Sequence, residues 1–346
     1  MKRLMELIVS LALLTGVLSG CAGTPAKNNV TDKPENTPAP TEISQPEASS
    51  DAAKTAWPRV YIDALGNEVV IESKPEKVVS TFHAMFPDYF YTFGVHPLAV
   101  AAAETRFNHL SAYKEFLAEK KPEDIGPADA LNFEKILSLA PDLIIATKLQ
   151  EGTYPQLSQI APTIILDHTS INANWKHGVE EFAKIFGEDD QVEEIISVVE
   201  KSVADGTEIL KEFRATNETV IFIAITGKQV FPYPVTQLKT VYNPIDEGGL
   251  GLIAPEAYTK LADYSQPLSL ETLATDYNPD HIFIIADNVD GDAKEYITQL
   301  EASTVWNNMH AVKNNHIYKI DRSIFGFNAP IATQFGVSYV VEKLTK

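Results

Sequence analysis

Several features that mark other protein classes are missing from this chain of 346 residues. It contains one cysteine, Cys21, so no intrachain disulfide can form. Outside the N-terminus, no apolar run is long enough to span a bilayer. The motifs of serine hydrolases, zinc proteases and phosphate-binding loops are absent, and the glycines of residues 248–251 lack dinucleotide-binding spacing. We therefore expect a protein that is not an enzyme.

Positive charge is also scarce. Lysine and arginine together number 28 against 47 acidic residues, which gives a formal net charge of −19. Because such a surface repels phosphate backbones, we expect no nucleic-acid partner. The eight histidines are scattered, and no pair has the close spacing typical of a zinc site. We therefore expect no cofactor and no metal ion held by the protein's own side chains.

The N-terminus carries the strongest local signal. Lys2 and Arg3 precede an apolar run over residues 7–18, and residues 18–21 read Leu-Ser-Gly-Cys. This is the layout of a secretory signal, and its end resembles a bacterial lipobox. The resemblance implies a signal peptide over residues 1–20 and a lipid on the thiol of Cys21. An ordinary signal peptide with an incidental cysteine is the alternative.

The next segment, residues 21–57, is rich in Pro, Thr, Ser, Ala and Glu and poor in apolar side chains. Such a composition cannot bury enough surface to order itself, so we interpret it as a disordered tether. A coil of this length reaches on the order of 35 Å. A lipid at Cys21 and a long tether favour attachment to the outer face of a cell membrane of the Gram-positive type.

The remainder alternates predicted strands and helices, which indicates an α/β fold. A hairpin is expected over residues 59–71, strands over 78–82 and 98–102, and a helix over 110–120. Residues 174–186 predict a helix closed by Gly187. A second, longer helix is expected over residues 189–213, with Gly206 inside it, and a last one over 329–344.

One internal repeat divides this region into two halves. Residues 131–145 and 268–285 each read as a helix opened by a capping residue, ended before a proline and followed by a buried strand. Glu134 and Glu271 fall at the second helical position of their copies. We therefore predict an N-terminal lobe over residues 58–172, a helical region over 173–214 with a long interlobe helix, and a C-terminal lobe over 215–346.

Taken over its whole length from about Trp57, the chain resembles the siderophore, haem and cobalamin group of periplasmic-type binding proteins. The matching segments are 63–71, 94–100, 125–145, 268–285, 306–318 and the last helix. The resemblance implies two Rossmann-like lobes joined by a single long α-helix. It also implies a monomeric substrate-binding component of an ABC importer, with Glu134 and Glu271 docking on arginines of the permease.

Ligand contacts are expected in the loops at the strand ends of both lobes. These loops hold aromatic and basic side chains, which suit the skeleton and the anionic oxygens of a ferric siderophore. The candidates are Arg106, Arg322, Trp175, Tyr233, His83, Lys228 and Phe325. No cluster of three or more cations stands out, which favours a hydroxamate or mixed citrate-hydroxamate siderophore over a catecholate.

Other ligands stay open at this point. Haem requires an axial ligand, for which His83 and Met85 are candidates. Cobalamin is a further alternative within the same fold. A protein that binds a metal ion directly is an alternative of another class.

Overall fold

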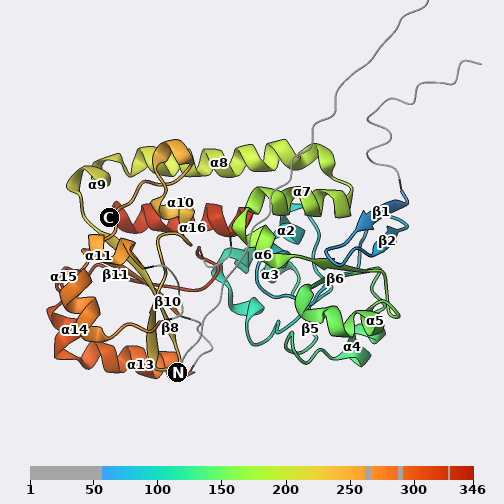
Figure 1. Ribbon diagram of the computed structural model, residues 1–346, viewed down its shortest axis with the longest axis horizontal. Helices are drawn as coiled ribbons and strands as arrows, with labels where there is room; N and C mark the ends of the chain where they lie inside the picture. The colour runs from blue at the N-terminus through green and yellow to red at the C-terminus, as the bar shows by residue number, and fades with distance from the viewer. Residues whose placement is uncertain (1–56, 262–265, 287–290, 326–327) are drawn as a thin grey trace, which may run out of the picture. The chain divides into compact units, whose positions relative to one another are not determined.

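Two separate sheets organise the folded part of the chain (Figure 1). The computed structural model describes residues 57–261, 266–286, 291–325 and 328–346. The predicted signal peptide, Cys21 and the predicted tether up to residue 56 lie outside the described residues. Among the described helices, none combines the length and apolar character needed to cross a membrane.

The first lobe is built on a five-stranded parallel sheet with the order β5-β4-β3-β6-β7. Its strands are β3 (Val78–Ser80), β4 (Ala99–Val100), β5 (Glu123–Asp124), β6 (Leu143–Thr147) and β7 (Thr163–Leu166). The helices and turns between them are α2 (Phe86–Thr92), η1 (Phe107–His109), η2 (Ser111–Tyr113), α3 (Lys114–Glu119), α4 (Phe133–Leu139), η3 (Lys148–Thr153), α5 (Tyr154–Leu157) and α6 (His168–Ala173). Every residue of β6 and β7 is buried, as expected for parallel strands covered on both faces.

A short hairpin precedes this sheet, as predicted. Strands β1 (Arg59–Ile62) and β2 (Glu68–Ile71) pair in antiparallel register. Asp63 holds the turn because its carboxylate accepts the backbone N–H groups of Leu65 and Asn67, each at 2.9 Å. Gly66 adopts a φ of 86°, which a glycine accepts without steric cost.

The second lobe has a four-stranded sheet with the order β11-β10-β8-β9. Its strands are β8 (Val220–Thr226), β9 (Gln229–Pro232), β10 (His281–Ala286) and β11 (Ile317–Ile320). The helices and turns are α10 (Lys239–Tyr242), η5 (Ile245–Glu247), α11 (Glu256–Thr259), α12 (Leu270–Thr272), η6 (Leu273–Tyr277), α13 (Gly291–Ala302), α14 (Thr304–Asn308) and α15 (His310–Lys313). Strands β8, β10 and β11 are parallel, and β9 adds an antiparallel edge.

Helices α7 (Trp175–Phe186) and α8 (Val192–Ile209) lead from the first sheet to the second, with η4 (Asp189–Gln191) between them and α9 (Lys211–Thr216) after them. The cap of α7 at Gly187 is as predicted. The expectation of one helix continuing to residue 213 is wrong, because α8 ends at Ile209 and Leu210 leaves the helical backbone conformation. The guanidinium Nη1 of Arg214 then donates to the carbonyl oxygen of Thr207 at 2.6 Å, which stabilises this break.

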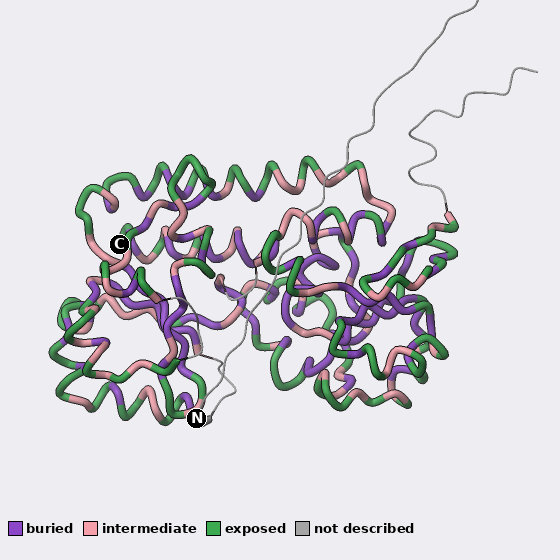
Figure 2. The backbone as a smooth tube through the Cα atoms, viewed as in Figure 1, coloured by how far each residue is buried: buried purple, intermediate pink, exposed green. Residues whose placement is uncertain are grey.

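The C-terminal helix α16 (Pro330–Leu344) is the second element shared by both lobes. Ala332 near its start belongs to the apolar core of the first lobe, whereas Val337 and Val340 belong to that of the second. Helix α16 packs along α8, which is exposed over much of its length (Figures 1 and 2). The long interlobe helix α8 is therefore supported by α16, which packs against it and contributes to the cores of both lobes.

Gly206 lies where α8 packs against α16. A Cβ atom added there would lie 2.6 Å from Cγ1 of Val337 and 3.3 Å from Cγ2 of Val341. A glycine that looked like a weak point of α8 is thus a packing position.

We expect Gly206→Ala to lower the free energy of unfolding by about 1 kcal/mol. Overpacking costs roughly 1–3 kcal/mol, which exceeds the gain in helix propensity of at most about 1 kcal/mol. Urea unfolding measures the difference. Gly152→Ala is the control, because a Cβ atom at Gly152 meets nothing within 4 Å. Gly206→Ala should cost less when Val337→Ala is already present, because the added methyl group then has space. A Gly206→Ala variant more stable than the wild type would contradict the packing argument.

Candidate functional site

The carboxyl ends of β3, β6 and β7 lie side by side at one edge of the first sheet. Ligands of open α/β sheets bind at this edge. The residues that follow the three strands there are Phe82, His83, Lys148, Leu149, Asp167 and His168. Of these, His83 alone is among the seven candidates named above, whereas Lys148 and His168 belong to the same loops from which those candidates were chosen.

Aromatic side chains form the centre of this edge. The ring of Phe82 lies 5.1 Å from that of His168 and 6.0 Å from that of His83. Nδ1 of His168 is buried and has no hydrogen-bond partner among the described residues. Leu149 stands beside them with 69% of its surface exposed. The first lobe thus presents an apolar and aromatic surface with imidazole groups at its margin.

Lys148 and Asp167 form an ion pair on the same edge. Nζ of Lys148 lies 2.7 Å from Oδ2 of Asp167, and this hydrogen bond is the main cause of the lowered pKa of the carboxylate. Asp167 also caps α6 by accepting the N–H groups of Thr169 and Ser170. The charge of Lys148 is therefore partly neutralised by the protein itself.

Arg106 lies at the same edge, after the neighbouring strand β4. It is exposed and sits directly before η1. The turn that carries it is fixed because Asp124 accepts the N–H of Glu104 at 2.7 Å. Arg106 and His83 thus follow neighbouring parallel strands of the first sheet, and their contact with a ligand stays a prediction.

The carboxyl edge of the second sheet carries Arg322 and Lys228. Arg322 follows β11, and its Nη2 donates to Oγ1 of Thr226 at the end of β8, at 3.2 Å. Lys228 follows β8, is exposed, and has its Nζ 3.7 Å from a carboxylate oxygen of Glu295. The two predicted cations of the second lobe thus occur at one sheet edge.

The three predicted aromatic contacts lie in different surroundings. Tyr233 is 9% exposed within the core of the second lobe, where its carbonyl accepts the hydroxyl of Tyr258. Phe325 is half-buried and packs edge-on against Phe222. Trp175 lines a hollow of about 660 Å³ along α8. The ligand roles of these three side chains stay predictions.

Glu134 and Glu271 occupy matching positions in the two lobes. Both are exposed in the first turn of their helices, α4 and α12, whose caps Asn132 and Ser269 accept the expected N–H groups. The repeat extends further than its sequence indicated. The carboxylate of the aspartate after each proline, Asp142 or Asp280, accepts backbone N–H groups just before the neighbouring strand β3 or β8.

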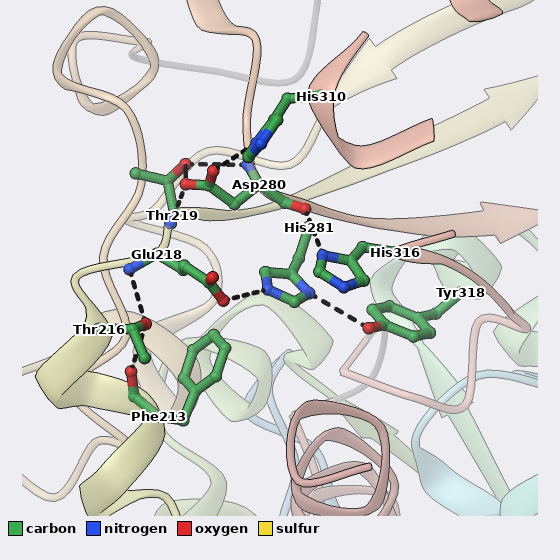
Figure 3. Close-up of polar contacts among 9 residues, drawn as sticks. All are labelled: Phe213, Thr216, Glu218, Thr219, Asp280, His281, His310, His316 and Tyr318. Atoms are coloured by element: carbon green, nitrogen blue, oxygen red, sulfur yellow. Dashed lines mark hydrogen bonds and ion pairs between the residues drawn. The ribbon is translucent and has the colours of Figure 1, made fainter. Parts of the chain in front are cut away.

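A histidine cluster near the start of β10 was not foreseen (Figure 3). The rings of His281 and His316 are stacked with centroids 4.1 Å apart. Nε2 of His281 lies 2.9 Å from Oε2 of Glu218, and its Nδ1 lies 3.2 Å from the hydroxyl of Tyr318. The group is polar, but the described residues contain no set of three or more metal-ligating side chains able to hold an ion.

Burial lowers the pKa of His281, and the adjacent His316 lowers it further against the opposing effect of Glu218. The unfolded chain therefore binds more protons than the folded one below about pH 6.5, so we expect stability to fall as the pH drops through that range. Urea midpoints between pH 5 and 8 measure this dependence.

His281→Phe is the matched variant, since it keeps a ring in the stack and removes the titration. Burial raises the pKa of Asp88 to about 6, so this carboxyl changes the stability with pH in the opposite direction. Both proteins contain Asp88, and subtracting the profile of His281→Phe from that of the wild type removes its contribution. Parallel profiles for the two proteins would contradict the assignment to His281.

The comparisons with known proteins agree with this architecture. Residues 79–323 match the family described as "Periplasmic binding protein". The "Iron-uptake system-binding protein" of Bacillus subtilis is 28% identical over 86% of this chain and 91% of its own. The "Iron(3+)-hydroxamate-binding protein FhuD" of the same organism is 29% identical over 88% and 91%.

Solved structures give the same result. The periplasmic binding protein component of a Fep/Fec-like ferrichrome ABC transporter from Bacillus subtilis has a TM-score of 0.67 at 26% identity, covering 83% of this chain and all of that one. The triscatecholate siderophore-binding protein FeuA of that organism, solved with ferri-bacillibactin, has a TM-score of 0.65 at 25% identity over 83% and 98%. The chain belongs to the periplasmic binding protein family, and its two-lobed α/β fold is confirmed.

Proposed function

We propose that this protein captures a ferric siderophore outside the cell and delivers it to the permease of an ABC importer. The observation that carries the proposal is the similarity to curated iron-uptake and iron-hydroxamate binding proteins over about nine tenths of their lengths. The carboxyl edges of both sheets support it, because they combine an aromatic surface at Phe82 with cations at Arg106 and Arg322. Lipid attachment at Cys21 and a monomeric state are parts of the same proposal.

A hydroxamate or mixed citrate-hydroxamate chelate is the ligand class we favour. Lys148 is partly neutralised by Asp167, and Lys228 lies near Glu295. The positive charge left for a ligand is therefore lower than the number of cations indicates. Hydroxamate groups suit this surface better than catecholates, because each hydroxamate carries one negative charge where a catecholate carries two. Met85 is only 4% exposed, which argues against its use as an axial ligand for haem.

A titration of tryptophan fluorescence tests the proposal. The mature protein is titrated with ferrichrome, ferric aerobactin (a citrate-hydroxamate chelate), ferri-bacillibactin, haem, cobalamin and ferric ion alone. We expect saturable 1:1 binding of a hydroxamate-containing chelate that persists when EDTA is added. Binding of haem or cobalamin alone would contradict the siderophore assignment. Binding of free ferric ion that EDTA reverses would indicate a direct metal site.

A further inference from the structure

Two buried carboxylates fasten the segment around Arg322 and the start of α16 to the first lobe. Asp321 is 6% exposed, and its Oδ2 accepts the backbone N–H of Ser111 in η2 at 2.9 Å. Its Oδ1 accepts the N–H of Ser323 at 2.8 Å. The hydroxyl of Ser323 donates to Asp321 and accepts the N–H of Ala112 at 3.1 Å. Arg322 thus lies between two residues that are bound to the backbone of the other lobe.

The second carboxylate, Asp88 of α2, holds the chain a few residues further on. It is fully buried and accepts the backbone N–H groups of Ile331 and Ala332 at 3.0 and 2.8 Å. The hydroxyl of Tyr113, in the same turn as Ser111, donates to Asp88 at 2.9 Å. An anion at the first turn of α16 also suits the helix dipole.

Two of these contacts cross directly between the lobes, because Asp321 and Ser323 accept backbone N–H groups of η2. Asp88 fastens the start of α16, the helix shared by both lobes, to α2. A relative movement of the lobes therefore strains or breaks several hydrogen bonds at once, and those to the carboxylates are charge-assisted. The acceptors Asp88, Asp321 and Ser323 are buried, and leaving a buried polar group unpaired costs more than losing an ordinary exposed contact. The side chain of Arg322 donates to Thr226 of its own lobe. Its neighbours Asp321 and Ser323 bind η2 of the first lobe, so Arg322 lies at the junction of both lobes.

We propose that Asp321 and Asp88 are positioning residues for ligand binding, which hold Arg322 at a set place relative to the aromatic surface of the first lobe before the ligand arrives. The inference rests on the proposed function. It explains why a carboxylate directly precedes a predicted anion-binding arginine. The carboxylate of Asp321 points toward η2 and already accepts hydrogen bonds from Ser111 and Ser323. Its role is to fix the backbone, and Arg322 contacts the ligand.

Two measurements on Asp321→Asn test the proposal. Asparagine offers one acceptor oxygen where three hydrogen bonds are now received, so the contact with η2 is lost. Without any ligand, we expect the amides of Ser111 and Ala112 to exchange hydrogen at least tenfold faster. With ferric aerobactin as the probe, we expect about tenfold weaker binding, because apparent affinity falls with the fraction of molecules in the competent arrangement.

A double-mutant cycle separates positioning from general destabilisation. If Asp321 acts through Arg322, then Asp321→Asn should weaken binding far less when Arg322→Ala is already present. Asp88→Asn should speed the exchange of Ile331 and Ala332 in the same way. Ser323→Ala is a milder variant that removes only the acceptor for Ala112. Asp142→Asn is the control, since Asp142 accepts backbone N–H groups within the first lobe alone.

The outcomes are distinct. Unchanged amide exchange at Ser111 and Ala112 in Asp321→Asn, or equal losses of affinity with and without Arg322, would overturn the positioning role while wild-type binding stands. Absence of chelate binding by the wild type would overturn the proposed function, and the positioning role with it. The exchange rates would then still decide whether the carboxylates hold the two lobes together.

Discussion

Uptake of the ferric chelate is expected to fall by about a hundredfold or more when Glu134 and Glu271 are both replaced by alanine, whereas its affinity for the purified protein should not change. Both carboxylates are exposed in the first turn of a short helix, at equivalent places in the repeat. Truncating one partner of a buried interfacial charge pair costs about 2–5 kcal/mol, and two such losses act on one docking event. Transport of iron-labelled chelate into cells and fluorescence titration measure the two quantities.

The control for this double variant must lose the same charge at similar positions. Glu193→Ala combined with Glu194→Ala meets this need, because both glutamates are exposed in the first turn of α8. This control removes two negative charges and two favourable interactions with a helix N-terminus. It should transport normally. Equal loss of transport in both double variants would reduce the effect to overall charge, and a parallel loss of affinity would assign Glu134 and Glu271 to the binding surface.

The single variants add a further distinction. If each lobe contacts one half of the permease, then Glu134→Ala and Glu271→Ala should each weaken transport, and the double variant should be worse than either. An effect confined to one of them would mean that only one lobe is held through a carboxylate.

Local signals in the sequence were sufficient for the framework of the fold. Gly66 predicts the turn of the hairpin, Gly187 the end of α7, and Asn132 and Ser269 the starts of the two repeated helices, because each acts on backbone groups a few residues away. The buried strands were equally readable from their continuous apolar runs. The strand near residue 99 and the helix near 110 were predicted too long, since η2 replaces the first turn of that helix.

The features that the sequence did not reveal depend on contacts between residues that lie far apart in the chain. No motif in the sequence singles out Asp88 or Asp321, and only the fold brings to them backbone N–H groups that lie 243 and 210 residues away in the chain. Gly206 reads as a defect in α8 until α16 lies against it. The same limit applies to Tyr233, whose burial follows from the packing of the second lobe. Long-range contacts of this kind leave no periodic or motif-like trace.

The candidate binding surface was partly predictable for a related reason. Loops after parallel strands meet at one edge whatever their sequence, so Arg106, His83, Arg322 and Lys228 could be assigned from the strand pattern alone. Which side chain in each loop faces outward depends on the local backbone conformation, and the strand pattern does not predict that conformation. Phe82 was therefore missed, although it lies two residues after β3 and its ring contacts those of His83 and His168.

Arg322→Ala should weaken the binding of ferric aerobactin about 10- to 100-fold and that of ferrichrome much less. Aerobactin carries free carboxylate charge in its ferric complex, whereas ferric ferrichrome is neutral. A hydrogen bond to a charged group contributes about 1.5–3 kcal/mol, and only the first chelate offers an anionic oxygen to the guanidinium. Arg106→Ala should show the same preference from the first lobe. Fluorescence titration with both chelates measures the two dissociation constants.

Two controls accompany this test: a conservative substitution at Arg322 itself and the loss of a cation far from the proposed site. Arg322→Lys keeps the charge but loses the planar pair of donors, so it should recover part of the affinity for ferric aerobactin and not all of it. Lys201→Ala removes one exposed cation from α8 and should leave both chelates unaffected. Equal weakening of both chelates by Arg322→Ala would mean that the arginine supports the local structure through Thr226. The neutral chelate thus separates an electrostatic contact with the ligand from a structural role, and it does so without a measurement of stability.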